Sequence, residues 1–212
     1  MSGIDKATIS FFIRLQRQLA KAMHMRGWNG SLRYLLGLDV SYARGVGVAA
    51  AVLYDYEEKT TIKSNVYKGK VFFPYIPGLL YLREAPLMLA AAEPLKDEFD
   101  LALVDGHGYA HPRRAGLAVI VGVLLDRPVV GIAKSLLEGR VEEVEGEVSA
   151  IVADGEVIGW ASAGPQRYYA SIGHAVSNED VRRIVLELGG SYPAPLREAH
   201  DLATRMANEA KG

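Results

Sequence analysis

The order of strand-like and helical segments constrains the fold of this chain more than any other feature of its sequence. Three strand-like runs, at 34–42, 46–54 and 60–72, follow one another with only short polar or glycine-containing links. Links this short join antiparallel neighbours. Two further apolar runs, at 101–105 and 129–133, are separated by a helical segment and so predict a parallel pair with a right-handed crossover. We therefore expect a mixed sheet, in which an antiparallel meander is followed by parallel strands.

Helices are expected on both faces of this sheet. Apolar spacing, capping residues and turn signals place them at about 4–25, 79–92, 113–125, 177–189 and 195–210. Pro86 marks a kink or a late start in the second helix. Ser177 and Asp180 form a capping signature for the fourth, and Asp154-Gly155 marks a hairpin just before it. This α/β arrangement matches a ribonuclease H-like core.

Length and composition set limits on the kind of protein. The chain has 212 residues, of which 50% are apolar, and this suits a single domain over 1–212. The longest apolar runs, 46–54 and 117–125, are far shorter than the roughly 18 residues of a membrane span. No secretory signal is visible, so we expect a cytoplasmic protein with no membrane partner. Because the chain has no cysteine, a metal would be held by carboxylates, imidazoles or water.

The charge pattern bears on nucleic-acid binding in two opposite ways. The formal net charge is −1, whereas nucleic-acid binders usually carry a basic surplus. Positive charge nevertheless gathers at Lys63, Lys68 and Lys70 and again at Arg113-Arg114, while acidic residues gather between 138 and 147. We therefore expect a polarised surface.

Two aspartates stand where a sheet of this kind gathers its ligands. Asp39 lies inside an otherwise apolar strand, where an ionised carboxylate is costly unless it is paired or bound to a metal. Asp105 ends the run at 101–105, and ligands in open α/β sheets collect beyond the carboxyl ends of strands. Either residue alone is more simply a turn or helix cap. Together they follow strands expected to be neighbours, so their oxygens could converge on Mg²⁺ or Mn²⁺.

Other polar residues are weaker candidates. Glu84 lies about one turn into a predicted helix, where it either interacts with the helix N-terminus or supplies a third oxygen ligand. Lys134 and Ser135 follow a strand, and the lysine is either solvated or placed to contact a phosphate. A lone helical histidine such as His200 is more often structural or exposed than a ligand.

Several motifs resemble those of the endonuclease V family. They are Phe73-Pro-Tyr-Ile-Pro-Gly-Leu-Leu-Tyr-Leu-Arg-Glu, Asp105-Gly-His-Gly-Tyr-Ala-His-Pro-Arg and Gly131-Ile-Ala-Lys-Ser, with Gly-Leu-Asp39-Val-Ser-Tyr before them and Arg-Glu-Ala-His200 after them. The resemblance runs in order from about residue 35 to residue 205. It implies a metal-dependent endonuclease of nucleic-acid repair, one that recognises deaminated adenine (inosine) and hydrolyses the second phosphodiester bond on its 3′ side. The products would carry a 3′-hydroxyl and a 5′-phosphate.

The resemblance also implies roles for individual residues. Asp39, Glu84, Asp105 and Lys134 would be catalytic, and the three carboxylates with His200 would hold Mg²⁺, for which Mn²⁺ would substitute. Tyr75, Ile76 and Pro77 would form a wedge that fills the gap left by a flipped nucleotide. The other contacts to inosine-containing DNA, or RNA, would come from Gly78, Leu80, Arg83, Gly106, His111, Arg113, Gly131, Lys134 and Ser135. We expect a monomer.

The sequence departs from the family pattern at three places. Val119-Ile120 replace a polar pair, His107 occupies a variable place between two glycines, and Ile172 stands where related proteins often have proline, near His174. Two other functions stay open, namely another ribonuclease H-like, structure-specific nuclease and a module that binds inosine without cutting. The Pro-Tyr-Ile-Pro motif argues against the first, and the four candidate catalytic residues argue against the second.

Overall fold

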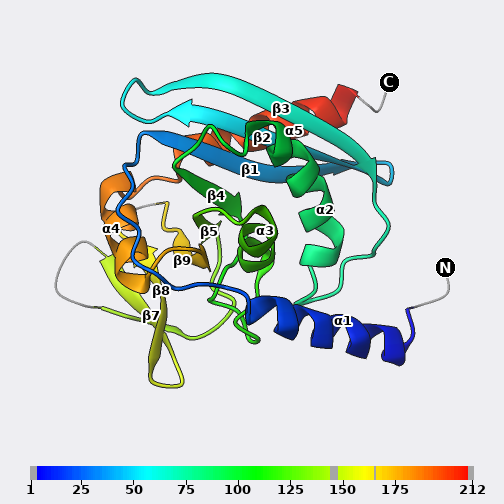
Figure 1. Ribbon diagram of the computed structural model, residues 1–212, viewed down its shortest axis with the longest axis horizontal. Coiled ribbons are helices and arrows are strands. Elements are labelled where there is room, and N and C mark those ends of the chain that lie inside the picture. The colour runs from blue at the N-terminus through cyan, green and yellow to red at the C-terminus, as the bar shows by residue number, and fades with distance from the viewer. Residues whose placement is uncertain (1–3, 144–147, 165, 210–212) are drawn as a thin grey trace.

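A nine-stranded sheet in the order β3-β2-β1-β4-β5-β9-β8-β7-β6 forms the centre of the molecule (Figure 1). The computed structural model describes residues 4–143, 148–164 and 166–209. The strands are β1 (Tyr34–Ala43), β2 (Val46–Asp55), β3 (Thr60–Lys70), β4 (Leu101–Asp105), β5 (Val129–Ala133), β6 (Arg140–Glu142), β7 (Val148–Ala153), β8 (Glu156–Ser162) and β9 (Tyr169–His174). The helices are α1 (Lys6–Ala20), α2 (Tyr81–Ala92), the short 3₁₀ helix η1 (Glu93–Leu95), α3 (Leu117–Leu125), α4 (Asn178–Leu188) and α5 (Ala194–Glu209).

The pairing of the first five strands confirms the predicted mixed sheet. β1, β2 and β3 form an antiparallel meander, and β1, β4 and β5 are parallel neighbours. β9 then pairs antiparallel with β5, and β8, β7 and β6 continue antiparallel from it. The middle of the sheet therefore consists of three parallel strands, β1, β4 and β5. Antiparallel strands flank them on each side.

Alternation along β1 divides its side chains between two cores. Leu36, Leu38 and Val40 pack with residues of α2 and α3, whereas Leu35 joins a second core with α4 and the start of α5. Each fully buried side chain of this size contributes roughly 1.5–3 kcal/mol. Figure 1 shows α2 and α3 in front of the sheet and α5 behind β1 to β3, so helices cover both faces as predicted. Because successive side chains point to opposite faces, Asp39 shares the α5 side with Leu35.

The start of α5 lies unusually close to β1. A Cβ atom added to Gly37 would meet the carbonyl oxygen of Pro195 at 2.2 Å. Only glycine therefore lets the helix begin directly over this strand. Further along, Ala199 and Ala203 pack on Ala50 and Val52 of β2. Gly37 and the alanines thus let α5 pack closely on β1, which carries Asp39, and on β2.

Several predicted boundaries were wrong for identifiable reasons. The helix expected at 113–125 begins at Leu117, because the preceding residues form a turn in which Arg114 has a φ of 53° and the amide of Gly116 donates to the carbonyl of Gly108. α1 ends at Ala20 instead of residue 25, because the backbone beyond it bonds to distant elements. His24 O accepts from the amide of Ala175, and Trp28 N donates to Asp180 Oδ2.

The remaining elements include two strands that were not predicted and two predicted features that are confirmed. β6 and β9 were not predicted, and α2 begins at Tyr81 and runs through Pro86. The capping box of Ser177 and Asp180 is confirmed, as is the β7–β8 hairpin at Asp154-Gly155. Residues 144–147 of the predicted acidic cluster and residue 210 of the predicted last helix lie outside the described residues. Within the described ranges, no helix is both long and apolar enough to cross a membrane.

Candidate active site

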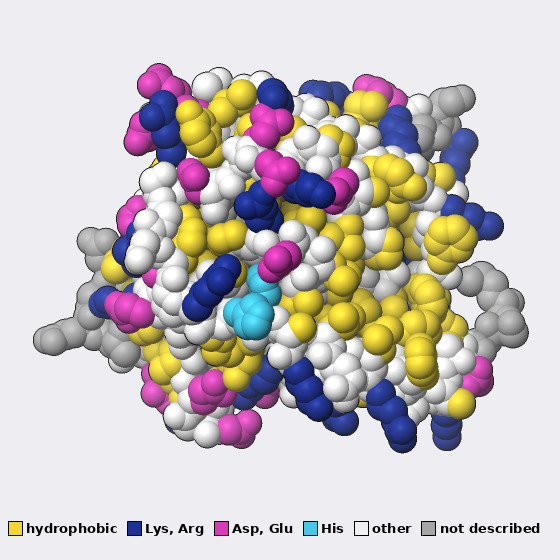
Figure 2. All heavy atoms as spheres, viewed as in Figure 1, with side chains coloured by type: hydrophobic (Ala, Val, Ile, Leu, Met, Phe, Trp, Pro, Cys, Tyr) yellow, Lys and Arg dark blue, Asp and Glu magenta, His cyan; other side chains and the backbone are white. Residues whose placement is uncertain are grey.

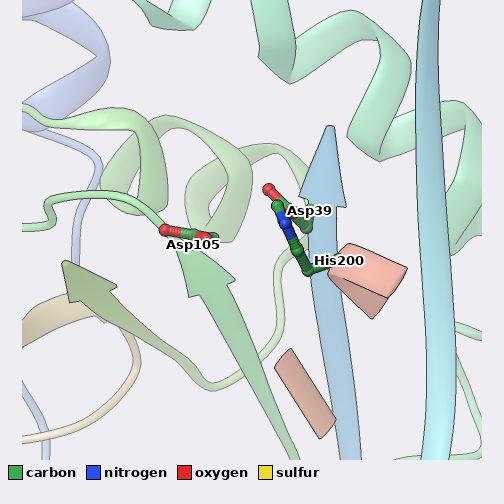
Figure 3. Close-up of side chains that lie close together, drawn as sticks. All are labelled: Asp39, Asp105 and His200. Atoms are coloured by element: carbon green, nitrogen blue, oxygen red, sulfur yellow. Dashed lines mark hydrogen bonds and ion pairs between the residues drawn. The ribbon is translucent and has the colours of Figure 1, made fainter. Parts of the chain in front are cut away.

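The register between β1 and β4 brings two aspartates together. Leu38 pairs with Val104, and Asp39 and Asp105 are the next residues on the two parallel strands. β4 ends at Asp105 while β1 continues to Ala43, so the two carboxylates lie together at the carboxyl end of β4. His200 comes from α5, and single ligand atoms of these three side chains all lie within 4.8 Å of one another (Figure 3). The structure thus joins the two aspartates to a histidine that the residue pattern alone could not place.

The surroundings of Asp39 make its charge costly unless a cation compensates it. The side chain is buried at 7% exposure, its Oδ1 accepts from the amide of Val40 at 2.8 Å, and its Oδ2 lies 2.7 Å from Nδ1 of His200. Burial, followed by the neighbouring Asp105 carboxylate, raises the pKa of Asp39, and the contact with His200 opposes this effect. Two carboxylates and an imidazole of this arrangement form a donor set that fits a divalent cation.

Glu84 reaches the same cavity from α2 on the other side of the sheet. It lines the cavity with Asp39 and Asp105, although it is not part of the three-residue cluster. The hydroxyl of Tyr42 donates to its Oε1 at 2.8 Å. Burial raises the pKa of Glu84 to about 7, with further upward contributions from the two aspartates, whereas the bond from Tyr42 lowers it. In the absence of a cation, Glu84 is therefore a carboxyl group that titrates near neutrality.

Lys134 is anchored by contacts with a carboxylate and an aromatic ring. Its Nζ lies 2.5 Å from Oδ2 of Asp105 and 4.8 Å from the centre of the Tyr192 ring, while 55% of its side chain is exposed. A lysine fixed by a carboxylate and an aromatic face can direct its charge toward a bound anion. The hydroxyl of Tyr192 is itself buried with no hydrogen-bond partner among the described residues.

A second cavity, with a volume of 240 Å³, adjoins the one that holds the carboxylates. Leu80, His107 and Ser135 line both cavities. Other residues around the second cavity come from the proline-framed motif, the loop after β4, the start of α3, α1 and the loop after β5. They are Gln16, Tyr75, Pro77, Gly78, Tyr81, His111, Gly116, Leu117 and Leu137. The two cavities together form a continuous recess beyond the ends of β4 and β5.

Gln16 of α1 joins the proline-framed motif to the loop after β4 through hydrogen bonds. The sequence pattern did not identify it as a site residue. Its Nε2 donates to the carbonyls of Gly78 at 3.1 Å and Ala115 at 2.5 Å, and its Oε1 accepts from Nε of Arg113 at 2.7 Å. Arg113 also donates to the carbonyl of Gly78. The guanidinium of Arg113, predicted to contact nucleic acid, is therefore engaged with the protein itself. Burial, followed by the charge of Arg113, lowers the pKa of His111 to about 4, so this imidazole is neutral at pH 7.

The remaining predicted contact residues differ in their surroundings. Tyr75 is 63% exposed, so its ring is not buried against the core, whereas Ile76 packs partly against the core. Arg83 stacks on the ring of Tyr42 at 4.0 Å. Gly106 lines the carboxylate cavity. Gly131 lies fully inside β5, where an added Cβ would meet the carbonyl oxygen of Gly106 at 2.6 Å, so it makes room for that loop.

The departures from the family pattern lie in or near the core. Val119 and Ile120 are buried within α3. The carbonyl of Ile172 accepts from the amide of Tyr109, and His174 is buried against the ring of His24. His107 lines the recess, where its Nε2 lies 2.8 Å from the carbonyl oxygen of Ser135. These substitutions therefore change internal packing, and only His107 faces the site.

Comparison with known proteins decides the family. Residues 14–201 match the model of the endonuclease V family. The chain belongs to the endonuclease V family. An endonuclease V of Sulfurisphaera tokodaii is 40% identical over 196 residues, which cover 92% of this chain and 94% of that protein. The family predicted from the motifs is confirmed, and the chain is a nuclease.

Solved structures of endonuclease V share this fold. The crystal structure of the Streptomyces avermitilis protein has a TM-score of 0.84 at 32% identity and covers 96% of this chain and 94% of that one. Endonuclease V of Ciona intestinalis, in complex with a 24mer DNA containing an inosine followed by a ribo-adenosine, has a TM-score of 0.86 at 26% identity. That match covers 97% of this chain and 100% of that one. The predicted α/β fold with helices on both faces is therefore the endonuclease V fold.

Proposed function

We propose that this endonuclease V cleaves inosine-containing nucleic acid at the second phosphodiester bond on the 3′ side of the lesion, in a reaction that requires Mg²⁺. The observation that carries the proposal is the convergence of Asp39, Asp105 and His200 within 4.8 Å, beside a cavity walled by the proline-framed motif. The products would carry a 3′-hydroxyl and a 5′-phosphate.

The charged groups of the first cavity support hydrolysis of a phosphodiester. Asp39 and Asp105 would hold the divalent ion, with His200 beside them and Glu84 on the opposite wall. When bound there, such an ion polarises the phosphate and orients the attacking water. Lys134 supplies a fixed positive charge next to Asp105, where negative charge builds up on the phosphate in the transition state. Mn²⁺ would substitute for Mg²⁺ because the donor set is rich in oxygen.

The second cavity supports recognition of an extruded base. Gly78 and Leu80 of the proline-framed motif line it, and because glycine permits close approach of the backbone, amide groups there would read the Watson-Crick edge of a purine. The exposed ring of Tyr75 at the mouth of this cavity would fill the gap in the stacked strand. The structure of the Ciona relative with inosine-containing DNA supports inosine as the lesion.

Cleavage of matched oligonucleotides tests the proposal. DNA and RNA strands with a single inosine, and the same strands with adenosine, would be incubated with Mg²⁺ and the cut positions mapped. We expect one cut, at the second bond 3′ to inosine, and none with a chelator. Asp39→Asn and Asp105→Asn should fold but not cut, whereas Asp154→Asn, in an exposed hairpin turn, should cut normally.

Each alternative function gives a different result in the same experiment. A structure-specific nuclease would not cut at the inosine, and would cut a flap or junction added as a further substrate. A binding module would retain the inosine strand without cutting it. Either pattern, obtained with folded wild-type protein, would overturn the proposed reaction.

A further inference from the structure

We infer that the outer strand β3 and the loop after it bind unpaired nucleotides on the 3′ side of the cleaved bond. The surface is a groove between β3 and α2, called here the β3 groove and defined by Tyr67, Lys70, Phe72, Arg83 and Pro86. The inference rests on the proposed function for the direction of the strand, and it adds a second contact surface outside the two cavities already described.

The charge of this part of the chain suits a polyanion. Between residues 59 and 83 the sequence contains Lys59, Lys63, Lys68, Lys70 and Arg83 but no acidic residue, in a chain with 24 basic and 25 acidic residues overall. Lys63 pairs with Glu98 from outside this segment. Within the part of the chain that the structure describes, no carboxylate lies within ion-pair distance of Lys70, so its charge is available to a phosphate.

Aromatic rings beside this charge suit bases. Tyr67 is 42% exposed and Phe72 is 81% exposed, and Nζ of Lys70 lies 6.0 Å from the centre of the Phe72 ring. Exposed rings next to cations form the stacking surfaces on which proteins bind single strands. Gly69 keeps the groove open, because a Cβ added there would lie 2.8 Å from Cε1 of Tyr67. Figure 2 shows hydrophobic side chains gathered over the region of α2 and α1, with basic side chains at their margin.

The β3 groove is connected to the carboxylate cavity through α2. Arg83 forms part of the groove and stacks on Tyr42, whose hydroxyl donates to Glu84 of the cavity. Two contacts therefore separate the groove from Glu84 in the wall of the carboxylate cavity. A strand that leaves the site along this side of α2 would meet Arg83 first and the rings of Phe72 and Tyr67 beyond it.

The sheet order gives the direction of the bound strand. The proposed base cavity lies between the proline-framed motif and the loops after β4 and β5, the carboxylates converge between β1 and β4, and β3 lies two strands beyond β1 in the sheet. Across the sheet the order is thus base cavity, carboxylates, groove. The proposed cut lies 3′ to the lesion. A nucleic-acid strand that runs from the base cavity past the carboxylates toward the groove therefore places the 3′ flank of the lesion in the groove.

A nucleic-acid strand fits this surface better than a protein strand. β3 is the outer strand of the sheet at its meander end, and such an edge can pair with another protein chain. Lysines on an edge strand discourage that pairing, and β3 carries Lys63, Lys68 and Lys70. The same lysines attract phosphates. The exposed rings add contacts that an added β-strand, bound through its backbone, would not require.

A binding experiment with two flank lengths tests the inference. Inosine strands with a long 3′ flank, or with a 3′ flank ending just past the cut, would be titrated in Ca²⁺ without turnover. The variants would be a Tyr67→Ser, Phe72→Ser double variant and Lys70→Gln. Matched controls are Leu124→Ser, another exposed apolar residue, and Lys96→Gln, an exposed lysine outside the segment 59–83.

We expect the wild type and both controls to lose affinity when the 3′ flank is shortened, on the order of tenfold for one lost stacking contact. The double variant should bind the long-flank strand about as weakly as the wild type binds the short-flank strand. Shortening the flank should not lower the affinity of the double variant further. Lys70→Gln should show part of the same effect. Equal losses on both strands, or unchanged binding by the double variant, would overturn the inference.

Undamaged strands separate this inference from the proposed function. If the wild type did not cut at inosine but the double variant still bound undamaged single strands more weakly than the Leu124→Ser control, the proposed reaction would fail and the groove would stand. If cutting occurred as proposed and the double variant bound every strand normally, only the groove would fail. Thermal unfolding of each variant would establish that these exposed substitutions leave the fold intact.

Discussion

Replacing Glu84 with glutamine should stabilise the metal-free protein at alkaline pH while abolishing cleavage. The pKa of this buried carboxyl group is about 7, against an ordinary value of 4.5. The folded state therefore binds a proton more tightly than the unfolded state, and stability is lost as the pH rises between these two values. This difference in pKa corresponds to a loss of about 3 kcal/mol in the free energy of unfolding above pH 7. Because the side chain is not fully buried, solvent screening lowers the expected loss to about 2 kcal/mol. Glutamine keeps the shape and still accepts from Tyr42.

Thermal unfolding in a chelator, at about pH 4 and about pH 8.5, measures this effect. We expect the two proteins to unfold at similar temperatures under acidic conditions. At alkaline pH, Glu84→Gln should unfold about 4–8 °C higher, since each kcal/mol corresponds to about 2–4 °C for a chain of this size. Saturating Mg²⁺ should narrow the gap, because a bound cation stabilises the folded wild type.

The control is Glu57→Gln, which removes an exposed carboxylate without touching the site. It should leave the pH dependence unchanged. If Glu84→Gln followed the wild type at both pH values, the burial cost assigned to Glu84 would be wrong. Equal stabilisation at both pH values would point to a packing effect instead of a charge effect.

Three further predictions concern separate parts of the molecule. Tyr75→Ala should weaken binding of inosine strands in Ca²⁺ without lowering the unfolding temperature, because the ring is exposed; a large loss of stability would show a core role. Tyr192→Leu should slow single-turnover cleavage, because Lys134 loses the aromatic face beside its ammonium group, whereas Tyr192→Phe keeps the ring and should retain the rate; equal rates for Leu and Phe would exclude this role. Gly37→Ala should destabilise the fold by about 1–3 kcal/mol through the clash with Pro195, measured by denaturant unfolding, and an unchanged midpoint would contradict the close packing.

The sequence predicted the features that depend on short-range pattern. Apolar runs and short links were enough to predict the meander and the parallel strands, and the position of Asp39 and Asp105 on those runs predicted that they would converge. Tyr42 was within reach of the same reasoning. It lies three residues after Asp39, so alternation sends it to the face where α2 carries Glu84.

Other features depend on contacts that no local pattern encodes. Gln16 is one amide in an amphipathic helix, and only the folded chain brings it to Gly78 and Ala115. β9 was missed because its short sequence, Tyr-Ala-Ser-Ile-Gly-His, contains small and polar residues, and pairing with β5 decides its conformation. The place of His200 came from the family motif, because a helical histidine alone does not reveal which strand its helix covers.

The distance along the chain between the partners of the site has a consequence during protein synthesis. Asp39 and His200 are 161 residues apart, and α5 also covers the rear face of β1 and β2. A ribosome releases the meander long before residues 194–209, so the growing chain exposes an apolar sheet face and lacks the imidazole of the cluster. Contacts this distant in sequence form late. A nascent chain therefore lacks the complete cluster of Asp39, Asp105 and His200 until α5 has emerged, and the same bare face makes interrupted synthesis products prone to aggregate.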